Sequence, residues 1–346
     1  MGVLVIGMHR SGTSALAGAL DAMGFEAGPP DDLMEGDEGN PQGYFELRSI
    51  ASLNDEILAH YRGRWDSPPV FAPGWEGDEA AKAFKVRARD ALKEVYESDL
   101  YVLKDPRISL LLPLWRQVTD ERTCAVVIVR EPLEVAASLT RRNALPTTSG
   151  LALWAAYNRA LLGGLEGMPV HLCSYTDLVN DPATVLSDIR NSLVAWNLIA
   201  EDTDLSSAIA SIRPDLRRNN ADESMREQST MPVEISGLLA SMLKQRGRHD
   251  RFSFDAPLDA GWWEEALLEE RRVLLNWALD RIAVLEAHGA NLETHSANLV
   301  VQSAAWQERF EASERERVAL QGRVDSVKKL IPGPLFRAVS KRPKGT

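Results

Sequence analysis

Gly7-Met8-His9-Arg10-Ser11-Gly12-Thr13-Ser14 is a glycine-bounded loop that comes directly after a short apolar run, Val3-Leu4-Val5-Ile6. An apolar, β-branched run before a glycine is typical of a strand, and the residues after Thr13 have the apolar spacing of a helix. A loop between a strand and a helix N-terminus presents backbone N–H groups to an anion. The stretch therefore predicts a phosphate-binding loop in an α/β protein.

The loop lacks the lysine of a nucleotide-hydrolysing P-loop. In that motif the second glycine is followed by Lys and then by Ser or Thr, and the lysine contacts the β- and γ-phosphates. Gly7, Gly12 and Ser14 occupy matching positions here, but Thr13 stands where the lysine would be. The sequence predicts a loop that holds a phosphate group without the main contact for a triphosphate.

A second anion-binding motif follows the apolar run 125–129. Arg130 comes at the end of this predicted strand, and Ser138 lies eight residues later, in a predicted helix. A guanidinium group is a planar, multidentate donor to anions, and a nearby hydroxyl adds a further hydrogen bond. A third motif, Ser174 to Pro182, again follows a predicted strand.

These three motifs, in this order and on these elements, resemble those of the PAPS-dependent sulfotransferases over roughly residues 1–218. PAPS is 3′-phosphoadenylyl sulfate. The resemblance implies that its 5′-phosphosulfate is bound by Arg10, Ser11, Gly12, Thr13 and Ser14. It also implies that Arg130 and Ser138 bind its 3′-phosphate.

Sulfuryl transfer needs less charge compensation than phosphoryl transfer. The transferring sulfuryl group carries one negative charge less, so backbone N–H groups, a helix N-terminus and one or two cations can stabilise it. We therefore expect PAPS as co-substrate and no metal.

Glu46 is the first candidate for the catalytic base. It ends a segment, Asn40-Pro41-Gln42-Gly43-Tyr44-Phe45-Glu46, that resembles one common in bacterial members of the same superfamily. A carboxylate at a loop-to-helix junction near the donor can accept the proton of a hydroxyl. The alternative is a first-turn glutamate that interacts with the helix dipole. His9 is the rival base, since imidazole titrates near neutrality, or else a loop histidine that contacts the backbone.

Lys104-Asp105-Pro106-Arg107 ends another predicted strand. Pro106 cannot continue a β ladder, so the charged side chains around it are expected at the carboxyl edge of the sheet, where open α/β sheets bind ligands. We assign Lys104 or Arg107, together with Arg10, to neutralising the transferring group or an acidic acceptor. Asp105 would orient one of them. A cluster of surface ion pairs is the alternative.

The predicted fold class is α/β, with a P-loop-like parallel sheet flanked by helices. A polar passage rich in Gly, Pro and Asp, residues 28–43, predicts a loop at the ligand-binding edge. The predicted strands are 2–7, 100–103, 123–129 and 169–173. The predicted helices are 13–23, 46–61, 78–97, 108–118, 132–143, 149–164 and 182–196.

Composition and charge limit the classes of partner and the cellular compartment that we expect. The net charge of −11 over 346 residues argues against general nucleic-acid binding. Cys124 and Cys173 both lie in predicted strands, which indicates buried reduced thiols and a reducing compartment. The first predicted strand begins at residue 2, and no apolar run is long enough to span a membrane. We expect a cytoplasmic enzyme.

The last third of the chain predicts a long helix with an incomplete heptad seam. Leu285, Leu292, Leu299 and Trp306 recur every seven residues, but the positions four residues later are only partly apolar. The seam predicts weak self-association, and a helix folded back on the body is the alternative. Six basic residues and no acidic ones follow between Lys328 and Lys344. They predict weak, reversible contact with the inner face of a membrane.

The sequence therefore predicts a sulfotransferase domain (residues 1–255), a helical or coiled-coil extension (262–331) and a basic tail (332–346). The predicted reaction moves the sulfuryl group of PAPS to a hydroxyl, on a carbohydrate or glycolipid. Two alternatives come from other classes. One is a nucleotide or small-molecule kinase with a degenerate P-loop, for which Asp105 would be the magnesium ligand. The other is an inactive transferase-like scaffold that carries a coiled coil.

Overall fold

The computed structural model describes residues 2–36, 43–213, 231–256, 258 and 262–330. The chain divides into two units, Met1–Asn276 and Trp277–Thr346. The predicted boundary at residue 262 is the start of helix α12, Trp262–Leu330. The first unit extends past it because Leu268 packs against the core and Arg271 pairs with Asp66. The predicted basic tail, 332–346, lies outside the described residues.

A five-stranded sheet forms the centre of the first unit. Its first four strands are parallel, and β5 pairs antiparallel with β4. The predicted parallel sheet is confirmed for those four strands, but β5 was not predicted because its three residues, Gly-Arg-His, show no apolar alternation. The spatial order is β2-β1-β3-β4-β5, with β1 Gly2–Ile6, β2 Tyr101–Lys104, β3 Cys124–Val129, β4 Val170–Ser174 and β5 Gly247–His249.

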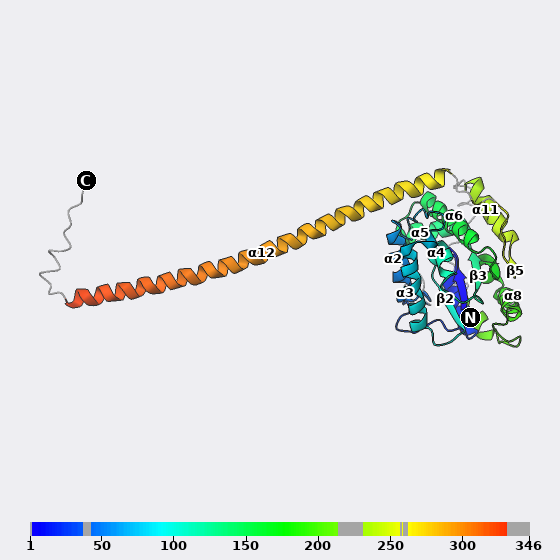
Figure 1. Cartoon of the computed structure of the whole chain (residues 1–346), viewed down its shortest axis with the longest axis horizontal. Helices are drawn as coiled ribbons and strands as arrows, with labels where there is room; N and C mark the ends of the chain where they lie inside the picture. The colour runs from blue at the N-terminus through cyan, green and yellow to red at the C-terminus, as the bar shows by residue number, and fades with distance from the viewer. Residues whose placement is uncertain (1, 37–42, 214–230, 257, 259–261, 331–346) are drawn as a thin grey trace. The chain divides into compact units, whose positions relative to one another are not determined.

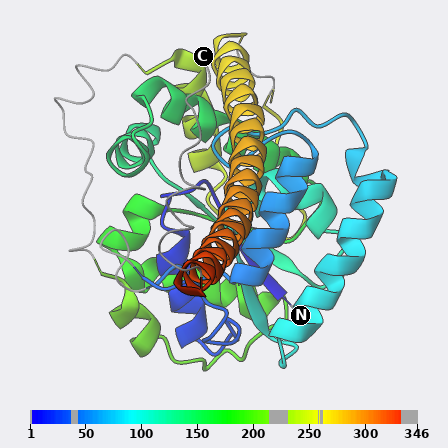
Figure 2. The ribbon, with the colours of Figure 1, turned by 90° about the vertical axis from the view of Figure 1, so that its left-hand side faces the viewer.

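Both faces of the sheet are covered by helices (Figures 1 and 2). Side chains alternate along each strand, so Leu4 and Ile6 of β1 enter one core while Val3 and Val5 enter the other. The first core is closed by α2 Arg48–His60, α3 Glu79–Val95, α4 Ile108–Trp115, α5 Pro132–Asn143, α6 Thr147–Gly164 and α11 Val233–Lys244. The second is closed by α1 Thr13–Ala22, α7 Tyr175–Asn180, α8 Pro182–Ala195 and α9 Ser206–Ser211.

The predicted elements differ from the observed ones mainly at their ends, where hydrogen bonding frays. The predicted helix 108–118 ends earlier, at Trp115, and the predicted helix 149–164 begins earlier, at Thr147. The short helices α7 and α9 and the later α11 were not predicted. Each of α7 and α9 has six residues, too few to show a helical apolar period.

The strand order brings three motifs to one edge of the sheet. From β1 the chain crosses to β2 on one side and later to β3 on the other, and ligands bind at such a switch point, outside the carboxyl ends of the strands. His9 follows β1, Lys104 ends β2 and Arg130 follows β3. The fold therefore places the glycine loop between the two other cationic motifs.

The two cysteines are buried free thiols, as predicted. Burial raises the pKa of both Cys124 and Cys173 to about 12, so neither thiol is a nucleophile at neutral pH. Of the helices that the structure describes, none combines the length and the apolar character needed to cross a membrane.

Candidate active site

The glycine loop turns sharply between β1 and α1. Gly12 caps α1 with a left-handed backbone, φ 94°, and Arg10 is also left-handed, with φ 68°. A Cβ atom added at Gly12 would lie 2.3 Å from the ring of Tyr175, and one at Gly7 would lie 2.5 Å from the carbonyl oxygen of Ile128. The loop is therefore held tightly against β3 and α7, with the N-terminus of α1 facing the cavity.

We expect Gly12→Ala to destabilise the loop and to weaken anion binding there. Gly24→Ala is the matched control, because Gly24 has a similar φ of 99° but nothing within 4 Å of the added Cβ. A left-handed alanine alone costs roughly 1–2 kcal/mol, and Gly12→Ala adds the clash with Tyr175. Thermal unfolding of both variants measures the difference. Equal losses of stability would show that the contact with Tyr175 does not constrain Gly12.

In the folded protein Lys104 supplies a positive charge beside the glycine loop, which has no lysine of its own. Its Nζ lies 3.3 Å from the hydroxyl oxygen of Ser14 and donates to the carbonyl of Tyr44 at 2.9 Å. The side chain is buried, because β2 ends beside the loop. A cation therefore stands at the N-terminus of α1 although the loop itself has Thr13 at that position.

Glu46 lies between two cations. One carboxylate oxygen, Oε1, accepts a hydrogen bond from Lys104 Nζ. The other, Oε2, is 3.6 Å from Arg107 Nη1, which is longer than a hydrogen bond. Glu46 precedes α2 rather than starting it, because the helix begins at Arg48. Its contacts are thus with the two cations that the sequence placed at the end of β2.

Arg107 is held by three carboxylates. Its Nη1 donates to both oxygens of Asp105, at 3.2 and 3.0 Å, and its Nε donates to Asp55 at 2.7 Å. These carboxylates and Glu46 hold the pKa of Arg107 above its usual range despite its burial. Asp105 is fully buried and also accepts from the backbone N–H of Arg107. The sequence interpretation had Asp105 orient Lys104 or Arg107, and these hydrogen bonds are with Arg107.

The second anion motif joins the glycine loop through Arg10. Arg10 Nε donates to the Ser138 hydroxyl at 2.9 Å, and Arg130 Nη1 donates to the backbone carbonyl of Arg10 at 3.0 Å. Arg130 also pairs with the buried Glu134 at 2.8 Å. Its guanidinium carbon lies 4.2 Å from the centre of the Tyr175 ring. Arg10 thus connects the two motifs across 128 residues of sequence.

His9 is buried beneath aromatic rings at the same cavity. Its ring centre is 4.9 Å from that of Trp65 and 5.5 Å from that of Tyr157, and its Nε2 has no hydrogen-bond partner among the residues that the structure describes. Burial lowers the pKa of His9 well below its usual value, and Arg107 and Lys104 lower it further. The imidazole is therefore neutral near pH 7.

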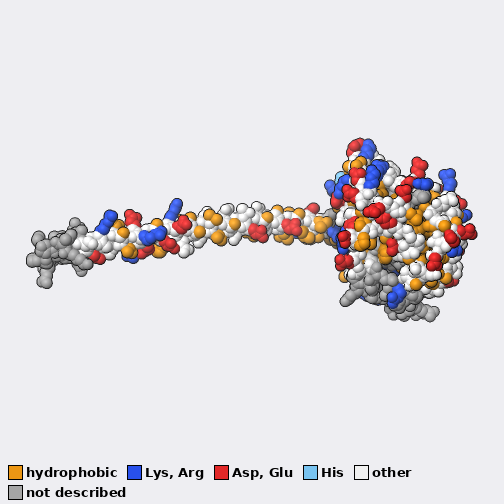
Figure 3. Space-filling model, turned by 90° about the horizontal axis from the view of Figure 1, so that it is seen from below, with side chains coloured by type: hydrophobic (Ala, Val, Ile, Leu, Met, Phe, Trp, Pro, Cys, Tyr) orange, Lys and Arg blue, Asp and Glu red, His pale blue; other side chains and the backbone are white. Residues whose placement is uncertain are grey.

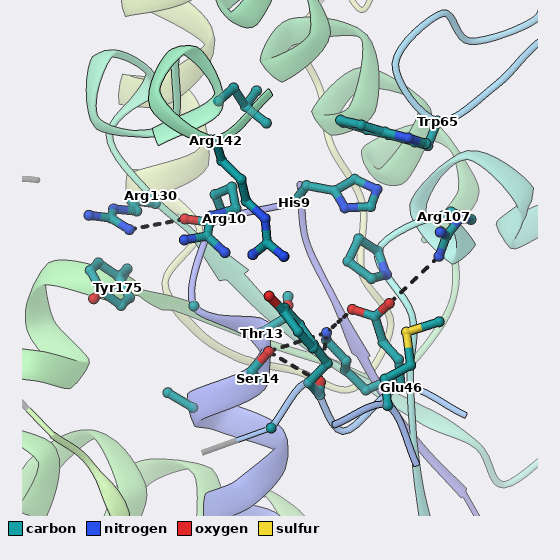
Figure 4. Close-up of a pocket in the computed structure, with 18 of the residues that line it drawn as sticks. His9, Arg10, Thr13, Ser14, Glu46, Trp65, Arg107, Arg130, Arg142 and Tyr175 are labelled. Carbon is teal, nitrogen blue, oxygen red and sulfur yellow. Dashed lines mark hydrogen bonds and ion pairs between the residues drawn. The ribbon is translucent and has the colours of Figure 1, made fainter. Parts of the chain in front are cut away.

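Residues of the glycine loop, Glu46, Lys104, Arg107 and Arg130 line one cavity of about 330 Å³ (Figure 4). Predicted site residues on its wall are Arg10, Gly12, Thr13, Ser14, Glu46, Lys104 and Arg130, whereas Ser11 and Ser138 lie behind it, buried. Trp65, Arg142, Tyr175 and Arg213 also line it, and of these Trp65 and Arg142 were not considered from the sequence. Arg142 follows the Ser138 motif by one helical turn, a spacing that could have indicated it.

Cations outnumber carboxylates on this wall. Figure 4 shows the guanidinium groups of Arg10 and Arg142 pointing into the same part of the cavity, beside His9. Glu46 is the one carboxylate among the lining residues that the structure describes, and it is already paired with Lys104. The cavity is therefore complementary to a ligand with several negative charges. Residues 40–42 of the segment that ends at Glu46 lie outside the described part of the chain.

Comparison with models of protein families found no match, and neither did a comparison with curated proteins. The solved structures that are similar to this chain include the following three. The sulfotransferase domain of the curacin biosynthetic pathway is 18% identical, over 70% of this chain and 96% of its own, with a TM-score of 0.39. The sulfotransferase domain of the Synechococcus PCC 7002 olefin synthase is also 18% identical, over 78% and 93%, with a TM-score of 0.39. A sulfotransferase from Alicyclobacillus acidocaldarius is 17% identical, over 70% and 95%, with a TM-score of 0.37. Each of these three similar structures is a sulfotransferase or a sulfotransferase domain.

Proposed function

We propose that this protein is a sulfotransferase that moves the sulfuryl group of PAPS to a hydroxyl acceptor. The observation that carries the proposal is the link made by Arg10 between two anion-binding motifs on one cavity. A donor with phosphate groups at both its 5′ and 3′ positions would occupy both motifs. A triphosphate chain carries its charges on one side of the ribose and would leave Arg130 without a ligand.

In this proposal the glycine loop and Lys104 hold the 5′-phosphosulfate. Backbone N–H groups at the start of α1 point at the phosphate, while Lys104 and Arg10 face the sulfuryl group, where negative charge moves toward the leaving oxygen. Arg130 holds the 3′-phosphate, and Ser138 positions Arg10 by accepting its Nε hydrogen bond. Hydrogen bonds and ion pairs within the protein hold these cations, which limits the reorganisation that donor binding would require.

Glu46 is the proposed base. Its Oε2 is the oxygen that can take the acceptor proton, because Oε1 is engaged by Lys104 and Oε2 has only the longer contact with Arg107. The acceptor oxygen would attack sulfur in line with the departing 3′,5′-ADP, as its proton passes to Glu46. His9 is the second candidate, although its Nε2 is covered beneath Trp65.

The kinase alternative is disfavoured by the contacts of Asp105. Both of its oxygens accept hydrogen bonds from Arg107, so the carboxylate that the alternative needs for magnesium is already occupied. Asp105 is also fully buried, away from the cavity wall. A magnesium ion there would have to displace a buried ion pair, which is costly.

We also propose that the hydroxyl acceptor is a carbohydrate or a glycolipid. Trp65 borders the cavity beside His9, and an aromatic face there could pack against the apolar face of a sugar ring. The cationic surroundings also suit an acceptor that carries a carboxylate or phosphate. A cytoplasmic site of action and a membrane contact through the basic tail remain proposals from the sequence.

The transfer reaction itself can be measured with PAPS whose sulfuryl group is radiolabelled and a panel of sugars and glycolipids. We expect label to pass to a hydroxyl acceptor and 3′,5′-ADP to be released in the presence of a metal chelator, because the proposed cations are all side chains of the protein. Transfer that needs added magnesium would contradict the proposed electrostatics.

A further inference from the structure

Helix α12 carries two heptad series of opposite size. The first series is large and apolar except at Ser313, and the second, which lies beside it on the same helix face, is mostly small or polar in its middle. The first series runs Leu285, Leu292, Leu299, Trp306, Ser313 and Leu320, and the second runs Ile282, Gly289, Ser296, Ser303, Phe310 and Arg317.

The large side chains of the first series are exposed on α12. Trp306 is 70% exposed and Leu292 is 59% exposed. Figure 3 shows hydrophobic side chains at the surface along this helix. A seam of two positions in every seven is typical of a coiled coil rather than of a helix packed broadly on a globular core or a lipid surface. A second helix of the same kind therefore fits this face.

A parallel pair in register would pack this seam poorly. Each residue would face its own copy, so Gly289, Ser296 and Ser303 would form three layers with almost no apolar contact. Arg317 would face the Arg317 of the other copy, and two like charges would share a buried layer. In this arrangement the large residues of one series do not face the small residues of the other.

An antiparallel pair makes the two series complementary, because each position of one series then faces the other series of the partner. In one register five of six layers combine a large residue with a small one, and the sixth combines two large apolar residues. Its layers are Ala278 with Arg317, Ile282 with Ser313, Leu285 with Phe310, Gly289 with Trp306, Leu292 with Ser303 and Ser296 with Leu299. Gly289 then leaves room for the largest side chain of the seam, Trp306.

Charge and length agree with this register. It places Arg281 beside Glu316 of the second copy on the flank of the seam. A parallel pair would also match opposite flank charges, Arg281 with Glu286 and Arg309 with Glu314, so the size pattern rather than charge decides the orientation. The paired segment, Ala278 to Arg317, covers more than five heptads and about 60 Å at 1.5 Å per residue. This exceeds the three to four heptads that indicate a coiled coil.

We propose that α12 forms an antiparallel coiled coil with α12 of a second copy of this chain, in the register that seats Trp306 against Gly289. The occupant of the exposed seam is thus the protein itself. The small residues of the seam would leave voids in a parallel pair, whereas in the antiparallel pair they face large residues. The pattern of residue sizes therefore favours antiparallel pairing.

Sedimentation velocity of the full chain tests the pairing. We expect twice the monomer mass of 38.2 kDa, and Leu292→Glu/Leu299→Glu should raise the dimer dissociation constant at least about tenfold by burying charge in the seam. Val301→Glu is the matched control: Val301 is 68% exposed on the same helix but lies outside both series. A monomeric wild-type chain, or equal dissociation in both variants, would overturn the proposal.

Cysteine cross-linking tests the orientation. A His295→Cys chain mixed with a tagged Gln302→Cys chain should give the mixed adduct on mild oxidation, because these flanking positions face each other in the proposed register. Ser303→Cys alone should give none, since each copy's Ser303 faces the other's Leu292. The natural thiols, Cys124 and Cys173, are buried and will not compete. A Ser303→Cys self-adduct without the mixed adduct would show a parallel pair and refute this orientation.

Discussion

Replacing Glu46 by Gln is expected to lower turnover by about 10²–10⁴-fold while leaving donor affinity intact. The amide keeps the shape of the carboxylate but cannot accept the acceptor proton. It also leaves Lys104 without its buried partner, so the site gains net positive charge and 3′,5′-ADP should bind as well as or better than to the wild type. Steady-state turnover and calorimetric affinity, measured on the same preparation, test the two halves of this expectation.

His9→Gln is the matched comparison for Glu46→Gln. Both changes place an amide on the wall of the same cavity, but only the base should be needed for proton removal. We expect the larger loss of turnover in Glu46→Gln. If His9→Gln shows the larger loss and Glu46→Gln retains near-normal turnover, His9 is the base and Glu46 only positions Lys104.

Arg130→Ala is expected to weaken 3′,5′-ADP binding by about 2–4 kcal/mol, or about 30- to 900-fold, because it removes a charge-assisted contact to a phosphate. Adenosine 5′-phosphate, which lacks the 3′-phosphate, should lose far less affinity. The wild type should therefore prefer 3′,5′-ADP strongly, and the variant should bind the two nucleotides almost equally. Isothermal titration calorimetry with both nucleotides measures this preference.

Glu134 requires a control in this experiment. It is buried and paired with Arg130 at 2.8 Å, so Arg130→Ala alone removes a buried ion pair and can destabilise the fold. The double variant Arg130→Ala/Glu134→Gln removes that charge, and it should recover stability without recovering the preference for 3′,5′-ADP. A variant that loses affinity for both nucleotides by the same factor would show that Arg130 supports the loop through the Arg10 carbonyl and does not bind a 3′-phosphate.

The parts of the fold predicted from the sequence are those with a local signal. The strands β1 and β3 are continuous apolar runs that end in a glycine loop or in Arg130, and both were located to within one residue. The parallel sheet followed because helices separate these strands. Strand β5 had no such signal, because its pairing with β4 is decided by the rest of the fold.

The residues of the candidate site also differ in whether a local sequence pattern indicates them. The glycine loop and the Arg130 motif are short local patterns, and the roles proposed for their residues come from the resemblance to sulfotransferases. The contact of Lys104 with Ser14 spans 90 residues and depends on β1 and β2 being neighbours, which sequence spacing does not reveal. The placement of Trp65 over His9 likewise depends on tertiary packing.

Isothermal titration calorimetry of the wild-type protein with 3′,5′-ADP and with ATP plus magnesium tests the proposed donor site most directly. Arg130 lies on the wall of the same cavity as the glycine loop and is tied to it through Arg10, and ATP has no 3′-phosphate to place there. We predict that 3′,5′-ADP binds with a dissociation constant in the micromolar range or below, about −8 kcal/mol or better, and that ATP with magnesium binds at least about tenfold more weakly. Equal affinity for the two ligands, or tighter binding of ATP with magnesium, would contradict a PAPS-dependent sulfotransferase.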